Sequence, residues 1–299
     1  MDPMDRTDIR ETAAAGEAAD HEETTHATGT DRVLPFRREV AAFERAAHRA
    51  LDGGGPAQPV PSCPGWSVAD LVGHLGGVHR YVAHILRGAL TERPDHGDLA
   101  LYGLPSDPAV LAAWPNPERA PNLAPAPPQL TEWFTEGAAD LAELFRATDP
   151  DLPVWTWHPD PAEHTAAFWL RMQTIEAAVH RWDAEGAIGE PAPVDPALAA
   201  DAVLQTIQAM APGRRAMQPV PPGEGERYRF RRTDGPGDWT VEFRGDEVRL
   251  APDGQAAVEL AGSASDLMLF LWHRVPAGAL TVTGEERLVD RYFELVPPV

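Results

Sequence analysis

The segment that decides the fold lies at residues 63–80, which read CPGWSVADLVGHLGGVHR. A proline-rich turn leads here to Ser67, whose side chain is placed to accept from the amide of Asp70, while the Asp70 carboxylate accepts from the amide of Ser67. Such a capping box opens a helix, and the apolar residues that follow continue at helical spacing. We therefore expect a helix that runs from this box to about Arg87.

Outward from this helix, apolar residues keep a helical period over the first two thirds of the chain. Gly186 closes the longest run, and Asp195 before Pro196 is typical of a capped helix start. The proline-rich stretch 93–129 is too long for a simple connection, so we expect it to pack over the surface as a lid or insertion. The further helices are predicted at 33–51, 130–146, 161–185 and 195–213.

The pattern changes after Arg227, where short strand-like runs alternate with turns of glycine and aspartate. Strands are predicted at 228–232, 239–243, 248–251, 257–261 and 280–282, with helices at 263–273 and 285–295. The predicted fold class is therefore α+β: a helical bundle over residues 33–213, followed by a small α+β domain over residues 227–299.

The charge of the chain excludes several classes of function. The 299 residues carry a formal net charge of -21, and all 25 residues counted as lysine or arginine are arginine. Without lysine there is no amine for Schiff-base chemistry and no phosphate-binding P-loop. A net charge this negative disfavours binding to nucleic acid or to an anionic membrane, so we expect neither partner. Residues 1–32, acidic and poor in large apolar side chains, are predicted to be a disordered tail.

Cysteine usage and hydropathy bear on the compartment. Cys63 is the single cysteine, so no internal disulfide forms, and no apolar run is long enough to cross a bilayer. The first 31 residues lack the basic start and apolar stretch of a signal peptide. We therefore expect a cytoplasmic protein. The pattern predicts no particular oligomeric state.

One pair among the eleven histidines and the many carboxylates has the spacing of metal ligands. Glu176 and His180 lie four residues apart in the most apolar part of a predicted helix, so their side chains project from one face, one turn apart. Such pairs also form by chance as solvated ion pairs. Here Ile175 and Val179 place the two polar groups near a buried face, where each needs a partner.

A tetrahedral metal site needs a third protein ligand, and the helix over 67–87 offers His74, His79 and His84. His74 is the best placed, because Gly76 and Gly77 follow it and their missing side chains would let a ligand or another helix approach closely. The alternative is that these glycines only allow tight packing, with His74 a satisfied core histidine. Spacing does not decide between the two.

The two segments resemble a known family. Residues 63–80 are similar to the signature that opens the second helix of the mycothiol-dependent maleylpyruvate isomerase family, and EAAVHRWDA at 176–184 is similar to its second signature. Residues 262–267 and 283–285 resemble its C-terminal domain, so the resemblance spans about 33–296. It implies a DinB-like four-helix bundle that binds a metal, followed by a sterol-carrier-like α+β domain.

Carried over residue by residue, the resemblance implies His74, Glu176 and His180 as the ligands of a divalent metal. Two imidazoles and one carboxylate with an open position are typical of catalytic zinc, although nickel, iron or manganese stay open. The family's cofactor is mycothiol, a thiol whose sulfur would enter the open position and lose its proton. In the isomerase reaction this thiolate adds to the double bond of an unsaturated acid, the single bond rotates, and the thiolate leaves.

Three arginines are candidates for binding the carboxylates of the substrate: Arg80, Arg181 and Arg274. Each is equally compatible with a surface or interdomain ion pair. Cys63 is interpreted as a small buried thiol rather than a nucleophile. We expect a small-molecule substrate, with specificity set in the insertion over 93–129.

Four other residues near the signatures have simpler interpretations. His79 is expected to face away from His74 and to be structural, and Trp66 and Trp182 are interpreted as core anchors. Asp183 is placed either to orient His180 or to cap the helix or pair with an arginine.

Three alternatives to the isomerase remain. The first is an S-transferase that stops after thiol addition or displacement. The second is a binding or regulatory module that keeps the bundle, with or without the metal, and catalyses nothing. The third is a hydrolase in which the metal holds hydroxide, but the sequence near Glu176 offers no evident second general base for it.

Overall fold

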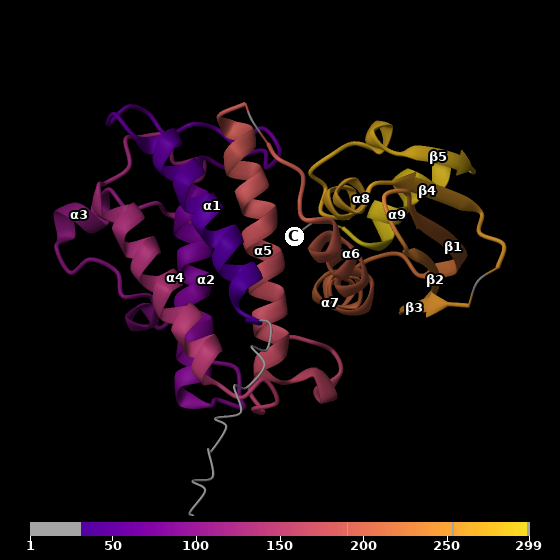
Figure 1. Ribbon diagram of the computed structural model, residues 1–299, viewed down its shortest axis with the longest axis horizontal. Coiled ribbons are helices and arrows are strands. Elements are labelled where there is room, and N and C mark those ends of the chain that lie inside the picture. Colours follow the sequence, from indigo (N-terminus) through magenta and orange to yellow (C-terminus); the bar gives the residue numbers. More distant parts are fainter. Residues whose placement is uncertain (1–30, 190, 253, 298–299) are drawn as a thin grey trace, which may run out of the picture. The chain divides into compact units, whose positions relative to one another are not determined.

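The computed structural model describes residues 31–189, 191–252 and 254–297. Four long helices lie side by side in its N-terminal part (Figure 1). They are α1 (Leu34–Leu51), α2 (Val68–Gly88), α4 (Gln129–Ala147) and α5 (Ala166–Ala187). The expected helix over 161–185 begins later, at Ala166, because Pro161–Glu163 forms a separate 3-10 turn capped by Asp160. The predicted acidic tail falls almost wholly on residues 1–30, outside the described residues.

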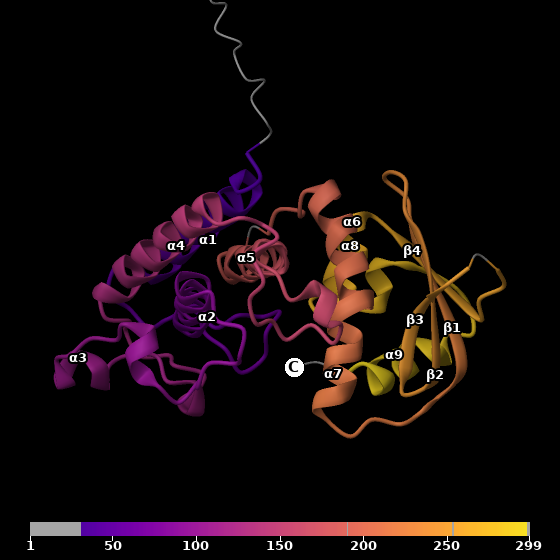
Figure 2. The same ribbon diagram turned by 90° about the horizontal axis from the view of Figure 1, so that it is seen from below.

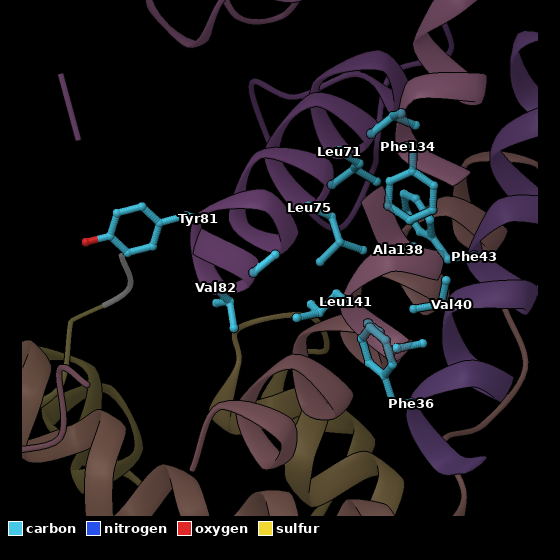
Figure 3. Close-up of a cluster of buried hydrophobic side chains, with 14 of the residues drawn as sticks. Phe36, Val40, Phe43, Leu71, Leu75, Tyr81, Val82, Phe134, Ala138 and Leu141 are labelled. Carbon is cyan, nitrogen blue, oxygen red and sulfur yellow. The ribbon is translucent and has the colours of Figure 1, made fainter. Parts of the chain in front are cut away.

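The bundle is held together by a core of aromatic and aliphatic side chains from α1, α2 and α4. Figure 3 shows Phe36 and Phe43 of α1 facing Leu75 of α2 and Phe134 and Leu141 of α4. All five are 1% exposed or less. Burying a phenylalanine or leucine fully contributes about 1.5–3 kcal/mol, so this layer dominates the stability of the bundle.

The proline-rich stretch forms an insertion between α2 and α4. It contains only short helices: η1 (Leu99–Tyr102), α3 (Pro108–Ala112) and η2 (Pro117–Arg119). Asx caps start all three, since Asp98, Asp107 and Asn116 each accept from the amide two residues on. The insertion packs on α2, as the predicted lid or insertion requires.

A long helical segment leads from the bundle to the C-terminal domain. It consists of α6 (Pro196–Gln205), one π-helical turn (Thr206–Met210) and α7 (Ala211–Met217). The capped start at Asp195 is confirmed, because its carboxylate accepts from the amides of Ala197 and Leu198. Pro212 lacks an amide hydrogen and its ring would clash with the carbonyl four residues back, which explains the wider π turn just before it.

The C-terminal part is a five-stranded sheet in the order β3-β2-β1-β4-β5. The β1–β4 pair is parallel and the other pairs are antiparallel. Helices α8 and α9 lie on one face of the sheet (Figure 2). The elements are β1 (Gly223–Arg232), β2 (Asp238–Gly245), β3 (Glu247–Ala251), β4 (Val258–Gly262), α8 (Ala264–Leu271), η5 (Ala277–Ala279), β5 (Thr281–Gly284) and α9 (Arg287–Leu295). The α+β fold class is thereby confirmed.

Helix α5 belongs to both hydrophobic cores. Its Phe168 and Met172 pack into the bundle core, whereas Ile175 and Val179 pack with α6, α8 and the sheet. A helix buried on two sides carries apolar residues on both of them, as α5 does. The polar residues on α5 therefore lie where the bundle meets the C-terminal elements. Among the described residues, no helix is both long and apolar enough to span a membrane.

Candidate functional site

The start of α2 anchors the site. The predicted capping box is confirmed: Ser67 Oγ accepts from the Asp70 amide at 3.2 Å, and the Ser67 amide donates to Asp70 Oδ2 at 2.8 Å. The same carboxylate oxygen accepts from the amide of Asn122 at 2.9 Å. The insertion is thus fastened to the helix that carries His74.

His74 and His180 come together although 106 positions separate them in the chain. Their ring centres are 5.1 Å apart and the rings are nearly perpendicular. Trp66 contacts both, with its ring centre 5.2 Å from that of His74 and 6.5 Å from that of His180. Helices α2 and α5 therefore present two imidazoles to one small volume beside an indole.

His74 is held in its neutral form. Burial, followed by the electrostatic effects of His180 and Arg274, lowers its pKa to about 3. A neutral imidazole is the form that binds metals. The His74 imidazole is therefore available as a metal ligand at every pH above its lowered pKa.

Asp183 fixes the other imidazole. Its carboxylate is fully buried, and Oδ2 lies 3.1 Å from Nδ1 of His180. Burial alone would raise the pKa of Asp183, but the hydrogen bond with His180 and the charge of Arg274 outweigh it, so the pKa is lowered. An ionised carboxylate only accepts, so Nδ1 of His180 carries the proton and Nε2 keeps its lone pair.

Two further residues hold Asp183 in place. Ser62 donates to Oδ1 at 2.6 Å, and Arg274 donates to Oδ1 at 2.9 Å and to Oδ2 at 3.0 Å. Ser62 comes from the α1–α2 connection and Arg274 follows α8. Three parts of the chain thus converge on the residue that orients His180.

Glu176 lies one turn before His180 and is half-buried. Burial raises the pKa of its carboxyl group, against the opposing effects of His180 and of a hydrogen bond from Gln173 Nε2 at 3.1 Å. Its carboxylate accepts this hydrogen bond from a neutral amide, and among the described residues no arginine shifts its pKa, so no permanent cation balances its charge. A divalent ion beside it would supply that charge.

The spacing of the His74 and His180 rings fits one tetrahedral ion. The full predicted set of three ligands, which adds Glu176, fits less well. Two rings that bind zinc through nitrogens at about 2.0–2.1 Å have centres about 5 Å apart, close to the separation of His74 and His180. However, across residues 31–189, 191–252 and 254–297, no three or more His, Cys, Asp or Glu side chains form a group arranged to hold a metal. The donor types and the buried charge fit a metal, and the three-ligand set stays a prediction.

A cavity of about 470 Å³ opens beside His74. One wall is α2 and the opposite wall is the insertion, through Tyr102, Leu104, Trp114 and Pro115. Pockets for small molecules have this mostly apolar lining with a few polar groups. The insertion thus shapes the space in front of His74, and its role in substrate specificity stays a prediction.

The sequence left open whether the glycines after His74 allow close helix packing or the approach of a ligand. One glycine does each. A Cβ on Gly76 would overlap the indole of Trp133 of α4, so Gly76 permits close helix packing. Gly77 instead lines the cavity, where a Cβ would meet Tyr102 at 3.7 Å.

Each of the three candidate arginines contacts other side chains of the protein, although Nη1 of Arg80 is buried without a hydrogen-bond partner among the described residues. The guanidinium of Arg80 stacks on Trp133, 4.4 Å from the ring centre. Arg181 forms ion pairs with Glu39 and Glu185. Arg274 pairs with Asp183 and also donates to the carbonyl of Trp272. Their roles in binding substrate carboxylates stay predictions, and Arg274 is the one that reaches the imidazole pair through Asp183.

Cys63 and His79 have surroundings that match their structural interpretations. Burial raises the pKa of the Cys63 thiol, which therefore stays protonated. His79 is fully buried between Phe36 and Phe134. Trp66, interpreted as a core anchor, packs against the bundle core, but it is half-buried and also contacts both imidazoles. Its position within the signature over 63–80 was the available signal.

The chain matches two family models and resembles two solved structures. The model described as the mycothiol maleylpyruvate isomerase N-terminal domain matches residues 36–185, and the MDMPI C-terminal domain matches residues 197–291. A crystal structure of the mycothiol-dependent maleylpyruvate isomerase has 17% sequence identity and a TM-score of 0.55, and one of a histidine-to-alanine mutant has 17% and 0.53. Both likenesses cover 85% of this chain and 93% of the other. No curated protein matches the chain.

Proposed function

The chain belongs to the mycothiol maleylpyruvate isomerase family, and from this premise we propose that it is a metal-dependent isomerase using mycothiol to act on an unsaturated acid of the maleylpyruvate type. The observation that carries the proposal is the approach of His74 and His180, whose ring centres lie 5.1 Å apart, with His74 lining the cavity. Two imidazoles at this separation, one of them oriented by a buried carboxylate, are the expected start of a catalytic metal site.

The metal would be held by His74, Glu176 and His180, and zinc suits this donor set. A divalent ion there supplies the positive charge that lowers the pKa of a thiol toward neutrality. The chain itself offers no competing nucleophile, since it has no lysine and the pKa of Cys63 is raised. A thiol from outside is therefore the consistent source of the nucleophile.

The protein's own residues contribute positioning and exclusion of water. Asp183 and Arg274 keep the lone pair of His180 Nε2 pointing away from Asp183. Tyr102 and Trp114 of the insertion cover the cavity, where a lower local dielectric strengthens electrostatic interactions. Trp66 lies beside the rings of both His74 and His180.

Turnover with defined components tests the proposal. The purified chain, loaded with zinc, is incubated with maleylpyruvate with and without mycothiol, and the products are identified. We expect mycothiol-dependent conversion of the cis acid to the trans acid with no net loss of thiol. Accumulation of a thiol conjugate would indicate an S-transferase instead, and hydrolysis without mycothiol would indicate the hydrolase. If no conversion occurs under any condition, the result would favour the binding or regulatory module that catalyses nothing.

Matched variants separate the site from the fold. His74→Ala and His180→Ala should abolish the conversion, whereas His79→Leu, on the same helix as His74, should retain it. Equal activity of all three variants would contradict the assignment of the site.

A further inference from the structure

Two adjacent arginines on α7 are almost fully buried but differ in their partners. Arg214 is 5% exposed and Arg215 is 7% exposed. Arg215 donates to main-chain carbonyl groups, among them those of Gly245 at 2.7 Å and Leu295 at 2.9 Å. The Nε and Nη1 atoms of Arg214 are buried and lack a hydrogen-bond partner among the described residues. A buried guanidinium without an acceptor is strongly unfavourable, so Arg214 needs a partner that the described chain does not supply.

The side chains around Arg214 also have unpaired polar atoms. Cζ of Arg214 lies 5.8 Å from the ring centre of Trp272, whose Nε1 has no partner among the described residues. The same is true of Nε2 of His273 and of the hydroxyl of Tyr292. We call Arg214, Trp272, His273 and Tyr292 the Arg214 cluster. Buried polar groups are nearly always hydrogen-bonded, so these four neighbouring groups call for partners that the described residues do not supply.

Among the described residues, no carboxylate shifts the pKa of Arg214 or of His273. Burial lowers the pKa of Arg214, the Tyr292 hydroxyl opposes this change, and the positive charge of Arg274 lowers the pKa further. Burial, followed by Arg214 and Arg274, lowers the pKa of His273 to about 4, so His273 is neutral near pH 7. The cluster therefore combines one permanent positive charge with neutral groups, which suits an anion with a single charge.

The end of α8 is shaped to bring these side chains together. The amide of Arg274 donates to the Leu269 carbonyl at 2.7 Å and that of His273 to the Phe270 carbonyl at 2.9 Å. These two bonds form a Schellman motif, in which His273 has φ +59 where most helices have glycine. Backbone strain of this kind in a residue other than glycine concentrates at ligand sites.

Helix α7 has its own irregularity just before Arg214. The π-helical turn Thr206–Met210 leads directly into α7, and such turns occur frequently at functional sites. Gly213, next to Arg214, lies against Trp157 of the α4–α5 connection, 3.7 Å from where its Cβ would be. The Arg214 end of α7 therefore lies close to the helical bundle.

We propose that Arg214, together with Trp272 Nε1 and His273 Nε2, binds the carboxylate of a small organic acid. The planar guanidinium matches the two oxygens of a carboxylate, and the ring N–H groups add neutral donors. A carboxylate carries the single negative charge that the cluster needs. The acid is either the substrate of the proposed isomerase or a separate free acid, and both use the same contacts.

Binding is tested without mycothiol, so that failure of the proposed reaction does not affect the result. Calorimetry measures the affinity of the full-length, metal-loaded protein for maleate, with dimethyl maleate as the uncharged control. We expect wild type to bind maleate and not its ester. Arg214→Met should weaken binding by about ten- to hundredfold and His273→Gly by about two- to tenfold. Arg146→Met, which removes an exposed arginine from α4, should leave the affinity unchanged.

Stability measurements distinguish a ligand site from a structural role. Arg214→Met removes an unpaired buried charge, so the unliganded variant should melt no lower than wild type. Arg215→Met loses several hydrogen bonds and should melt lower. His273→Gly relieves the positive φ and should fold at least as well as wild type. Unchanged maleate affinity in both Arg214→Met and His273→Gly, or no binding of maleate to wild type, would overturn the proposal.

Competition with turnover identifies the source of the acid. If maleate competes with the substrate and Arg214→Met raises KM, the cluster holds the carboxylate of the substrate. If maleate binds wild type through Arg214 without competing, the cluster holds a separate acid. Both results support a carboxylate site.

Discussion

Helix α2 buries two histidines five residues apart, and the two have different surroundings. Burial lowers the pKa of each to about 3, so both are neutral near pH 7. His74 lies beside the cavity and contacts a second imidazole, which Asp183 orients. His79 lies between two phenylalanine rings, and neither of its ring nitrogens has a partner among the described residues.

The difference teaches that burial and a lowered pKa do not by themselves identify a functional histidine. Both histidines share these properties. What distinguishes His74 is a second imidazole ring on another helix, at 5.1 Å between ring centres, and open space in front. Two imidazoles could bind one cation at His74, whereas His79 has no second ligand beside it among the described residues.

The largest expected effect is on turnover. His180→Ala removes an imidazole from the pair and is expected to lower kcat by about a thousandfold or more, because the stabilisation by a metal is worth several kcal/mol. His79→Leu should stay within about threefold of wild type, since it replaces an unpaired ring in an apolar layer. Steady-state assays at matched metal concentration measure both. A His79→Leu variant as inactive as His180→Ala would erase the contrast between the two histidines.

A smaller effect is expected at the residue that orients the second ring. Asp183→Asn keeps the shape but loses the charge, and it can present its amide group to His180 instead of an acceptor. We expect metal affinity or activity to fall by about 10- to 100-fold, as for other residues that orient metal-binding histidines. Titration of the apoprotein with zinc measures the affinity. Wild-type affinity in this variant would show that Asp183 acts only through its ion pair with Arg274.

Substitutions of the two glycines after His74 compare two sides of α2. Gly76 lies on the side that packs against α4, and Gly77 lies on the side that lines the cavity. Gly76→Ala should lower the free energy of unfolding by about 1–3 kcal/mol, because its Cβ would overlap Trp133. Gly77→Ala has room and gains helix propensity, so its stability should match or exceed that of wild type. Denaturant unfolding measures both variants. Equal destabilisation would show that both glycines face packed side chains.

A further expected effect concerns acid stability. His79 has a folded pKa of about 3, against 6.5 for the ordinary side chain. The unfolded chain therefore binds a proton first, so the stability contributed above pH 6.5 is lost as the pH falls toward 3. The loss is about 1.4 kcal/mol per pH unit. His79→Leu should reduce the slope of unfolding free energy against pH by this amount, and an unchanged slope would contradict the buried, neutral assignment.

Local signals predicted much of the fold. The capping box at Ser67 and the caps near Asp195 depend on residues two or three positions apart, so the sequence shows them directly. The π turn was missed, and a single helix was expected over 195–213, although Pro212 was the available signal. The late start of α5 follows from the separate turn at Pro161–Glu163, which periodicity does not resolve.

The site was predictable only where side chains share an element or a sequence signature. Glu176 and His180 follow from helical spacing, and His74 required the family resemblance. The contact of Asn122 with Asp70 and that of Arg274 with Asp183 join residues 52 and 91 positions apart. The significance of Arg214 lies in partners that it lacks, which depends on the packing of the whole domain and leaves no local pattern.

Metal content tests the central claim most directly. The protein is purified without chelator, and bound zinc, nickel, iron and manganese are measured for wild type, His74→Ala, His180→Ala and His79→Leu. The account predicts about one divalent ion per chain in wild type and His79→Leu, and loss of that ion in the other two variants. Equal metal content in all four proteins would contradict it.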